Sequence, residues 1–295
     1  MHFRPSTAFV LATVVSQALA HCVITSITGA NGVTMPGLSV IDGTPRDCAS
    51  PLCGSEADTS VIRRNGPPLG KTSGGGEVDA AAAVAKFMGN GAKAAARFKR
   101  NLLGSRFDVK RRGLLDGLDN VLGGAAGGGG GGGKAAEASG AKTPKGTVED
   151  GVAKSAGTGA TSGLPTVGAD GVINMVMHQV NQDGAGPMTA AIDPTSGGTS
   201  EAAFQPAEMI ADVPGAIAGI SGTTTTDFPI KVQMPAGMKC SGTVAGVENV
   251  CVVRVKNSTP AGPFGGSAVF TQEGAATGGN ATAAAKRDIR VVFDA

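Results

Sequence analysis

Tryptophan and tyrosine are absent from this chain of 295 residues, and aromatic residues make up only 3% of it. Proteins use exposed aromatic rings to stack on nucleobases and to hold crystalline polysaccharide. The formal net charge is also small, at +2 for pH 7, so no global field attracts nucleic acid or an anionic membrane. These deficits argue against a nucleic-acid partner. A hydrophobic content of 41% is nevertheless enough to build a buried core.

Long apolar runs are scarce as well, and the clearest one lies near the N-terminus. Residues 1–20 carry Arg4, an apolar stretch over 8–15, and small side chains at Ala18 and Ala20. This order is typical of a secretory signal peptide that is cleaved after Ala20. No later segment has about 18 apolar residues in a row, the length that a transmembrane helix needs. We therefore predict a secreted protein, extracellular or at the cell surface, with no transmembrane segment.

Glycine, by contrast, is abundant, with 48 residues and an unbroken run over 127–133. Such a run gains too little burial to offset its backbone entropy. A basic stretch mixed with leucines, over 93–112, precedes it, so we interpret 91–165 as a low-complexity basic and glycine-rich insertion. The basic stretch could bind an anionic surface. Its composition is more typical of a solvated loop flank, or of a dibasic processing site at 99–100 or 111–112.

The rest of the chain carries short alternating apolar runs, separated by clusters of Gly, Pro and Asp, that predict β-strands. The alternation is clearest over residues 230–234. An Ala-rich segment over 77–88, followed by a glycine, predicts one short helix. We therefore predict a mainly β fold, an immunoglobulin-like β-sandwich, as a single domain over 21–295 interrupted by the insertion at 91–165.

Five cysteines in an exported chain predict at most two disulfides and one remaining thiol. The pairs that lie close in sequence are Cys48 with Cys53 and Cys240 with Cys251, which leaves Cys22 as the odd residue. A bridge between Cys22 and Cys48 is the alternative.

Two tripeptides, beginning at Asn257 and Asn280, match the acceptor pattern for N-glycosylation. A proline at 260 directly after the first tripeptide reduces its expected use. Both asparagines are predicted glycosylation sites of a secreted protein.

Histidine is rare, and cleavage after Ala20 would leave only His21 and His178 in the mature chain. An N-terminal histidine offers its free amine and one ring nitrogen to the same metal ion. A second imidazole from His178 would add a third nitrogen, a set that suits the tetragonal preference of Cu(II). We interpret the pair as a candidate copper site. The alternative is an incidental N-terminal histidine, with His178 as a half-buried strand residue whose ring is hydrogen-bonded.

Five ungapped stretches resemble a known family closely, and together they span much of the mature chain. They cover residues 29–48 (GANGVTMPGLSVIDGTPRDC), 53–60, 177–187 (MHQVNQDGAGP), 228–238 and 261–266. These stretches are similar to the fungal Egh-like family, whose members include the Gas and Mas appressorium-specific proteins. The resemblance implies a secreted or cell-surface fungal protein of infection structures, linked to host penetration and virulence, with no established reaction.

The histidine pair also resembles the copper brace of lytic polysaccharide monooxygenases, which have an immunoglobulin-like sandwich fold. In those enzymes an aromatic residue fills the axial side of copper, and a Gln or Glu lies just behind it. That resemblance implies these roles for Phe270 and Gln272. Two features depart from the patterns: Cys22 stands where the Egh-like family has glycine, and the missing tyrosine and tryptophan argue against a polysaccharide-binding surface.

Three functional hypotheses follow from these observations. The favoured one is a non-catalytic infection factor that binds copper, a host surface or a cell-wall glycan. The second is a copper-dependent monooxygenase acting on a glycan, and the third is a structural or adhesive surface protein. Copper stoichiometry separates the third from the others, and oxidised oligosaccharide products separate the second from the first.

Overall fold

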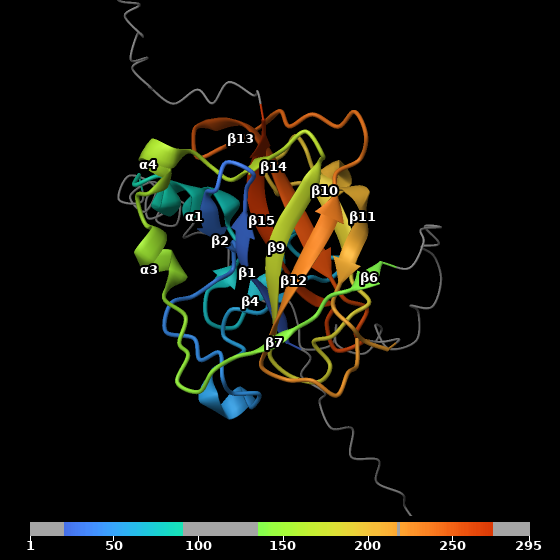
Figure 1. The fold of residues 1–295 in the computed structure, drawn as a ribbon. Helices are drawn as coiled ribbons and strands as arrows, with labels where there is room; N and C mark the ends of the chain where they lie inside the picture. The colour runs from blue at the N-terminus through green and yellow to red at the C-terminus, as the bar shows by residue number, and fades with distance from the viewer. Residues whose placement is uncertain (1–20, 91–134, 217–218, 274–295) are drawn as a thin grey trace, which may run out of the picture.

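The computed structural model describes residues 21–90, 135–216 and 219–273 (Figure 1). Over these residues the chain is mainly β, as predicted, with a few short helices. The strands are β1 (Cys22–Thr28), β2 (Thr34–Pro36), β3 (Ser60–Val61), β4 (Lys71–Thr72), β5 (Gly76–Glu77), β6 (Ala136–Glu137), β7 (Ala141–Lys142), β8 (Thr166–Val167), β9 (Val172–Gln179), β10 (Thr189–Asp193), β11 (Gln205–Asp212), β12 (Thr226–Gln233), β13 (Gly242–Val244), β14 (Val247–Lys256) and β15 (Phe264–Gln272). The helices are α1 (Ala80–Phe87), α3 (Gly151–Ser155) and α4 (Gly159–Ser162), with 3-10 turns η1 (Pro51–Cys53) and η2 (Glu201–Ala203).

The strands form one curled sheet, in which most neighbours are antiparallel. Its order is β2-β1-β9-β12-β11-β10-β14-β15-β3-β4-β5. The two halves are joined by β11, because Gln205–Ala207 pairs with β10 whereas Glu208–Ala211 pairs with β12. Figure 1 shows β1, β9 and β12 side by side in front of β14 and β15, with α1, α3 and α4 together on one side. The curl brings β1 against β15.

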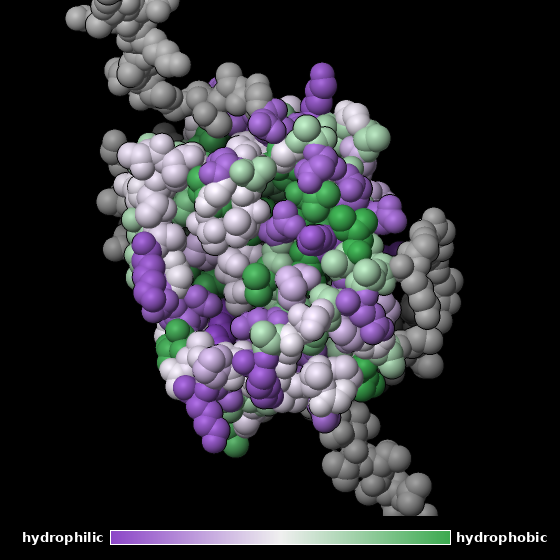
Figure 2. Space-filling view, in the orientation of Figure 1, coloured by the Kyte–Doolittle hydropathy of each residue, from purple (hydrophilic) through white to green (hydrophobic). Residues whose placement is uncertain are grey.

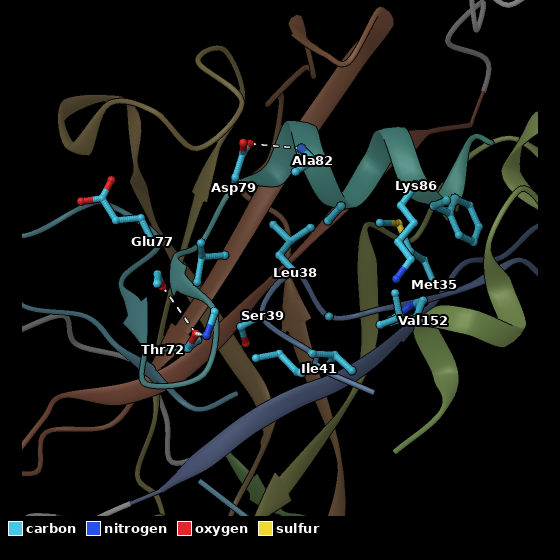
Figure 3. Close-up of a pocket in the computed structure, with 18 of the residues that line it drawn as sticks. Met35, Leu38, Ser39, Ile41, Thr72, Glu77, Asp79, Ala82, Lys86 and Val152 are labelled. Carbon is cyan, nitrogen blue, oxygen red and sulfur yellow. Dashed lines mark hydrogen bonds between the residues drawn. The ribbon is translucent and has the colours of Figure 1, made fainter. Parts of the chain in front are cut away.

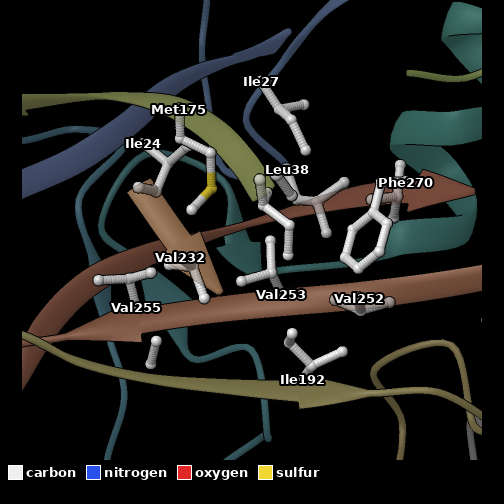
Figure 4. Packing of buried hydrophobic residues seen from close by; sticks show 14 of the residues in the cluster. Ile24, Ile27, Leu38, Met175, Ile192, Val232, Val252, Val253, Val255 and Phe270 are labelled. Carbon is white, nitrogen blue, oxygen red and sulfur yellow. The ribbon is translucent and has the colours of Figure 1, made fainter. Parts of the chain in front are cut away.

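The core lies between the two halves of this sheet. Alternation along β12 buries Phe228, Ile230 and Val232, as the sequence pattern predicts for a strand with one face in a core. Figure 4 shows Val232 together with side chains of the opposite half, such as Val253. Valine and isoleucine predominate in this core because β-branched side chains pack well on a pleated surface.

Helix α1 begins and ends as the sequence predicts. The side chain of Asp79 accepts hydrogen bonds from the backbone N–H groups of Ala81 and Ala82, and thereby satisfies two of the free donors at the helix start. Gly89 follows the helix with a φ of +75°, a left-handed conformation that ends helices at little cost for glycine.

The expected insertion at 91–165 is too long, because its last 31 residues belong to the fold. Strands β6 and β7 pair with β11 and β12, respectively. Asp42 accepts hydrogen bonds from the backbone of Val152 and Ala153 at the start of α3. The glycine run and both dibasic pairs lie within 91–134, outside the described residues.

Both disulfides predicted from sequence proximity are confirmed. Cys48 is bonded to Cys53, and Cys240 is bonded to Cys251. The second bridge ties the approach to β13 to the middle of β14. Cys22 is a free thiol and is completely buried, so the alternative bridge to Cys48 is excluded.

The surface is polar over most of the face in Figure 2, where hydrophobic residues form small green patches among purple and white ones. Only three large hydrophobic side chains are strongly exposed among the described residues: Leu52, Val148 and Ile220. Leu52 is 96% exposed at the tip of the loop that the Cys48–Cys53 disulfide closes.

Candidate functional site

His178 lies near the end of β9 with its side chain fully buried. The register pairs it with Val23 on β1 and with Asp227 on β12. Its Nδ1 atom lies 2.6 Å from Oδ1 of Asp227, and this contact fixes the orientation of the ring. Its Nε2 atom is buried and has no hydrogen-bond partner in the structure. A buried ring nitrogen without a partner is costly, and it is also the state in which a histidine can bind a metal ion.

His21 directly precedes β1 and is 8% exposed. Its backbone N–H donates to Oδ1 of Asn181 at 2.8 Å, and its carbonyl accepts from the N–H of Val180 at 2.9 Å. The ring nitrogen Nδ1 lies 3.1 Å from Oε1 of Glu56. The ring of Phe264 packs against the imidazole, with the centroids 4.9 Å apart.

The sheet register brings the two histidines close to each other. Because Val23 pairs with His178, His21 is a diagonal neighbour of His178 across the pair of β1 and β9. Diagonal neighbours of this kind have Cα atoms about 7–8 Å apart. Alternation along β1 and β9 assigns both side chains to the face opposite Cys22 and Met177, which belong to the core.

Glu56, which contacts His21, and Asp183, whose charge acts on Glu56, both have raised pKa values. Burial, and secondly the negative charge of Asp183, raises the pKa of Glu56 to about 7. Burial also raises the pKa of Asp183, against the effect of a backbone hydrogen bond that lowers it. The Cys22 thiol has its pKa raised far above the usual range, first by burial and then by the charge of Asp183. Near neutral pH, Glu56 can therefore carry a proton, while Cys22 stays a neutral thiol.

The loop that carries Glu56 is held on both sides. The Cys48–Cys53 disulfide lies just before it in sequence. Asp58, two residues after Glu56, receives two hydrogen bonds from the guanidinium of Arg46, at 3.0 and 2.6 Å. Arg46 also binds Glu149, with Nη2 and Oε2 2.8 Å apart. Burial alone would lower the pKa of Arg46, but its contacts with Asp58 and Glu149 raise it.

The segment before Asp227 carries backbone strain. Thr225 has a φ of +42°, which is rare for a β-branched residue because its side chain crowds the backbone. Hydrogen bonds hold it in place: its N–H donates to the carbonyl of Val180, and its carbonyl accepts from the N–H of Thr143. Strain of this kind persists only where the surrounding structure over-determines it. Here it lies two residues from the partner of His178.

Phe270 and Gln272, the residues expected beside the metal, lie elsewhere. The aromatic ring against His21 is that of Phe264, and Phe270 lies six residues further along β15, about 20 Å at the usual rise of a strand. Phe270 is fully buried in the core. The side chain of Gln272 accepts from the N–H of Cys240 and donates to the carbonyl of Met238. Gln272 thus holds the loop next to the second disulfide.

Asn257, expected as a glycosylation site, is buried instead, with 2% of its surface exposed. Its Nδ2 atom, to which a glycan would be attached, donates to the carbonyl of Asp183 at 3.1 Å. Its Oδ1 atom accepts from the N–H groups of Thr259 and Phe264. The folded chain therefore has no room for a glycan there, and the asparagine closes the turn before β15. Asn280 lies outside the described residues.

Four residues of the site were not identified from the sequence: Glu56, Asn181, Asp227 and Phe264. Three of them lie inside stretches that resemble the Egh-like family, at 53–60, 177–187 and 261–266. Their proximity to a cysteine, a histidine or a Gly-Pro turn was the available signal. Asp227 lies directly before such a stretch, and only the pairing of β9 with β12 could reveal its role.

Within the described residues, no three side chains of His, Cys, Asp or Glu are close enough together to hold a metal ion. A brace needs only two histidine side chains, because the N-terminal amine supplies the third nitrogen. Among the same residues there is no helix with the length and apolar character needed to cross a bilayer.

A family model described as the Egh16-like virulence factors matches residues 19–265. The chain belongs to this family. It is 49% identical over 282 residues to the appressoria-specific virulence factor GAS2 of Pyricularia oryzae, and the match covers 92% of this chain and 90% of that protein. It is also 41% identical over 105 residues to the appressoria-specific virulence factor GAS1 of the same organism, covering 36% of this chain and 41% of that protein. No solved structure matches the chain. The family assignment agrees with the resemblance read from the sequence motifs.

Proposed function

We propose that this member of the Egh16-like family is a secreted protein of fungal infection structures that aids host penetration and binds one copper ion through His21 and His178. The similarity to GAS2 over nearly the whole chain supports the role in virulence. The signal-peptide pattern and the two disulfides support secretion. The two facing halves of the curled sheet are compatible with the immunoglobulin-like sandwich expected from the sequence.

The copper proposal rests mainly on the Nε2 atom of His178. This nitrogen is buried without a partner, while Asp227 holds the opposite ring nitrogen at 2.6 Å. Histidines that bind metals usually donate their second ring N–H to a carboxylate in this way, which fixes the tautomer and exposes the other lone pair. In a mature chain that begins at His21, the amine and Nδ1 of that residue would complete a set of three nitrogens.

Glu56, Asn181 and Phe264 have defined roles in this proposal. Glu56 lies 3.1 Å from Nδ1 of His21, so a metal ion at Nδ1 would replace that contact. Asn181 binds both the backbone nitrogen of His21 and the carboxylate of Glu56, and so it holds the N-terminal residue and the loop together. Phe264 shields one face of the His21 ring from solvent. Copper bound here would supply a redox-active ion.

The partner that we propose is a host surface or a cell-wall glycan, and catalysis is not part of the proposal. A chain without tyrosine or tryptophan lacks the surface rings with which many polysaccharide-active monooxygenases hold a crystalline substrate. We therefore expect reduced copper in this protein to produce little oxidised glycan. Regiospecific oxidised products would favour the monooxygenase hypothesis instead.

The test is a copper titration of protein secreted with His21 as its first residue, followed by calorimetry. We expect one Cu(II) per chain. One additional residue before His21 should weaken binding strongly, because the amine becomes a peptide nitrogen. Asp227→Asn should weaken it about 10- to 100-fold, the usual effect of removing a carboxylate behind a histidine ligand.

The matched control is Asn174→Ala, which alters an exposed residue on the same strand, four positions from His178. It should leave copper affinity unchanged. The proposal fails if His178→Ala binds Cu(II) as tightly as the unaltered protein while its circular dichroism spectrum and melting temperature remain those of a folded chain.

A further inference from the structure

A cavity of about 270 Å³ lies between helix α1 and the segment that follows β2. Met35, Leu38 and Ile41 form its floor, and Val152 lies at one end (Figure 3). Phe87 also lines the cavity. Its volume is close to the lower limit of about 300 Å³ for pockets that bind small molecules. The walls are mostly apolar, so the cavity suits a small ligand with an apolar body.

The polar groups around this cavity differ in availability. Asp79 is occupied, because its carboxylate caps α1. Glu77 lies 3.9 Å from Lys71, is 68% exposed and points away from the cavity in Figure 3. Lys86, on the last turn of α1, extends toward Met35. No ion pair of Lys86 is found among the described residues, so its ammonium is the charge available to a ligand.

Ser39 provides a second polar feature. Ser39 lines the cavity, and only 6% of its surface is exposed. Its hydroxyl has no hydrogen-bond partner among the described residues. Buried hydroxyls are rarely left without a partner, because each costs about 1–3 kcal/mol when unsatisfied. In Figure 3, Ser39 and Lys86 lie on opposite sides of Leu38, so this hydroxyl is not a second contact for a group held by Lys86.

We propose that this cavity binds a medium-chain carboxylate, with its alkyl chain against Leu38, Ile41 and Phe87 and its carboxylate at Lys86. The apolar walls account for the chain and the ammonium for the negative charge. The proposal is independent of the histidine pair, which has none of its residues among those that line the cavity.

Octanoate is the probe that tests it, measured by calorimetry on the secreted protein and by displacement of a fluorescent fatty acid. The absence of tryptophan and tyrosine lowers the protein's own fluorescence, which favours the second assay. Octanoate should bind at a single site. Octanol, which has the same chain without the charge, should bind more weakly, and acetate should not bind.

Ala82→Phe, with its matched control Ala81→Phe, identifies the site. Both residues are exposed on α1, but only Ala82 lines the cavity. The larger ring at position 82 should abolish octanoate binding, whereas the control should retain it. Lys86→Met should weaken octanoate about fivefold, the upper effect of one partly exposed charge, and leave octanol unchanged.

Equal binding of octanoate by the Ala82→Phe and Ala81→Phe variants would overturn the assignment of the site. Equal affinity for octanoate and octanol, unaffected by Lys86→Met, would overturn the choice of a carboxylate. Failure of octanoate to bind to the unaltered, folded protein at millimolar concentration would overturn the proposal as a whole.

Discussion

Asp58→Asn should destabilise the protein strongly, because it leaves the guanidinium of Arg46 buried beside a neutral amide. Asp58 is fully buried and Arg46 is only 4% exposed. The pair makes two hydrogen bonds, at 3.0 and 2.6 Å, and the backbone N–H of Ile41 also donates to Asp58. Removing one partner of a buried ion pair costs about 3–5 kcal/mol. Glu149 stays in contact with Arg46, so we expect a loss of about 3 kcal/mol.

This loss should be visible in thermal and chemical unfolding. For a domain of this size, about 1 kcal/mol shifts the melting temperature by roughly 2–4 °C, so the expected decrease is about 6–12 °C. The control is Glu77→Gln, which breaks the exposed pair with Lys71, and it should cost less than about 1 kcal/mol.

Equal destabilisation by Asp58→Asn and by Glu77→Gln would contradict this expectation. It would mean that solvent already compensates the charges of Arg46 and Asp58.

Three further predictions concern other parts of the chain. Asp193 accepts hydrogen bonds from Thr195, Ser196 and Gly198. Burial alone would raise the pKa of Asp193, but these hydrogen bonds lower it. The stabilisation by the ionised carboxylate is therefore present above the unfolded-state pKa and is lost as pH falls through the lower folded-state pKa. Asp193→Asn should cost about 1.5–3 kcal/mol at pH 7 in urea unfolding and less at pH 2, and a cost that does not depend on pH would contradict this. The thiol of Cys22 should not react with a maleimide in the native protein at pH 8 but should react once in denaturant, as followed by mass spectrometry, because it is buried and protonated. Asn257 should carry no glycan in protein secreted from a fungal host, and a glycosylated peptide at this position would show that the turn is open during secretion.

The sequence predicted those features that depend on local chemistry. Alternation identified β12, the Ala-rich run and its glycine identified α1, and short sequence separation identified both disulfides. Features that depend on pairing between distant segments could not be predicted. The pairing of β9 with β12 places Asp227 at His178, and the contact between Arg46 and Glu149 joins residues 103 positions apart.

Composition was a poor guide in two places. Residues 135–165 continue a glycine-rich stretch, yet their two short strands, β6 and β7, pair with the sheet. Backbone pairing of this kind leaves little trace in side-chain composition. Asn257 fits the acceptor tripeptide, but its amide closes a buried turn, because the pattern reports sequence and not exposure. The placement of Phe270 failed similarly: the run 267–272 indicated a strand, but not which of its ends lies near His21.

The most direct test of the proposed copper site is the nitrogen hyperfine spectrum of one equivalent of Cu(II) bound to protein that begins at His21. We predict three nitrogens on the copper ion: the amine and Nδ1 of His21, and Nε2 of His178. In His178→Ala the spectrum should show only the two nitrogens of His21. A spectrum dominated by oxygen ligands, or one that is unchanged in His178→Ala, would contradict the proposed copper site.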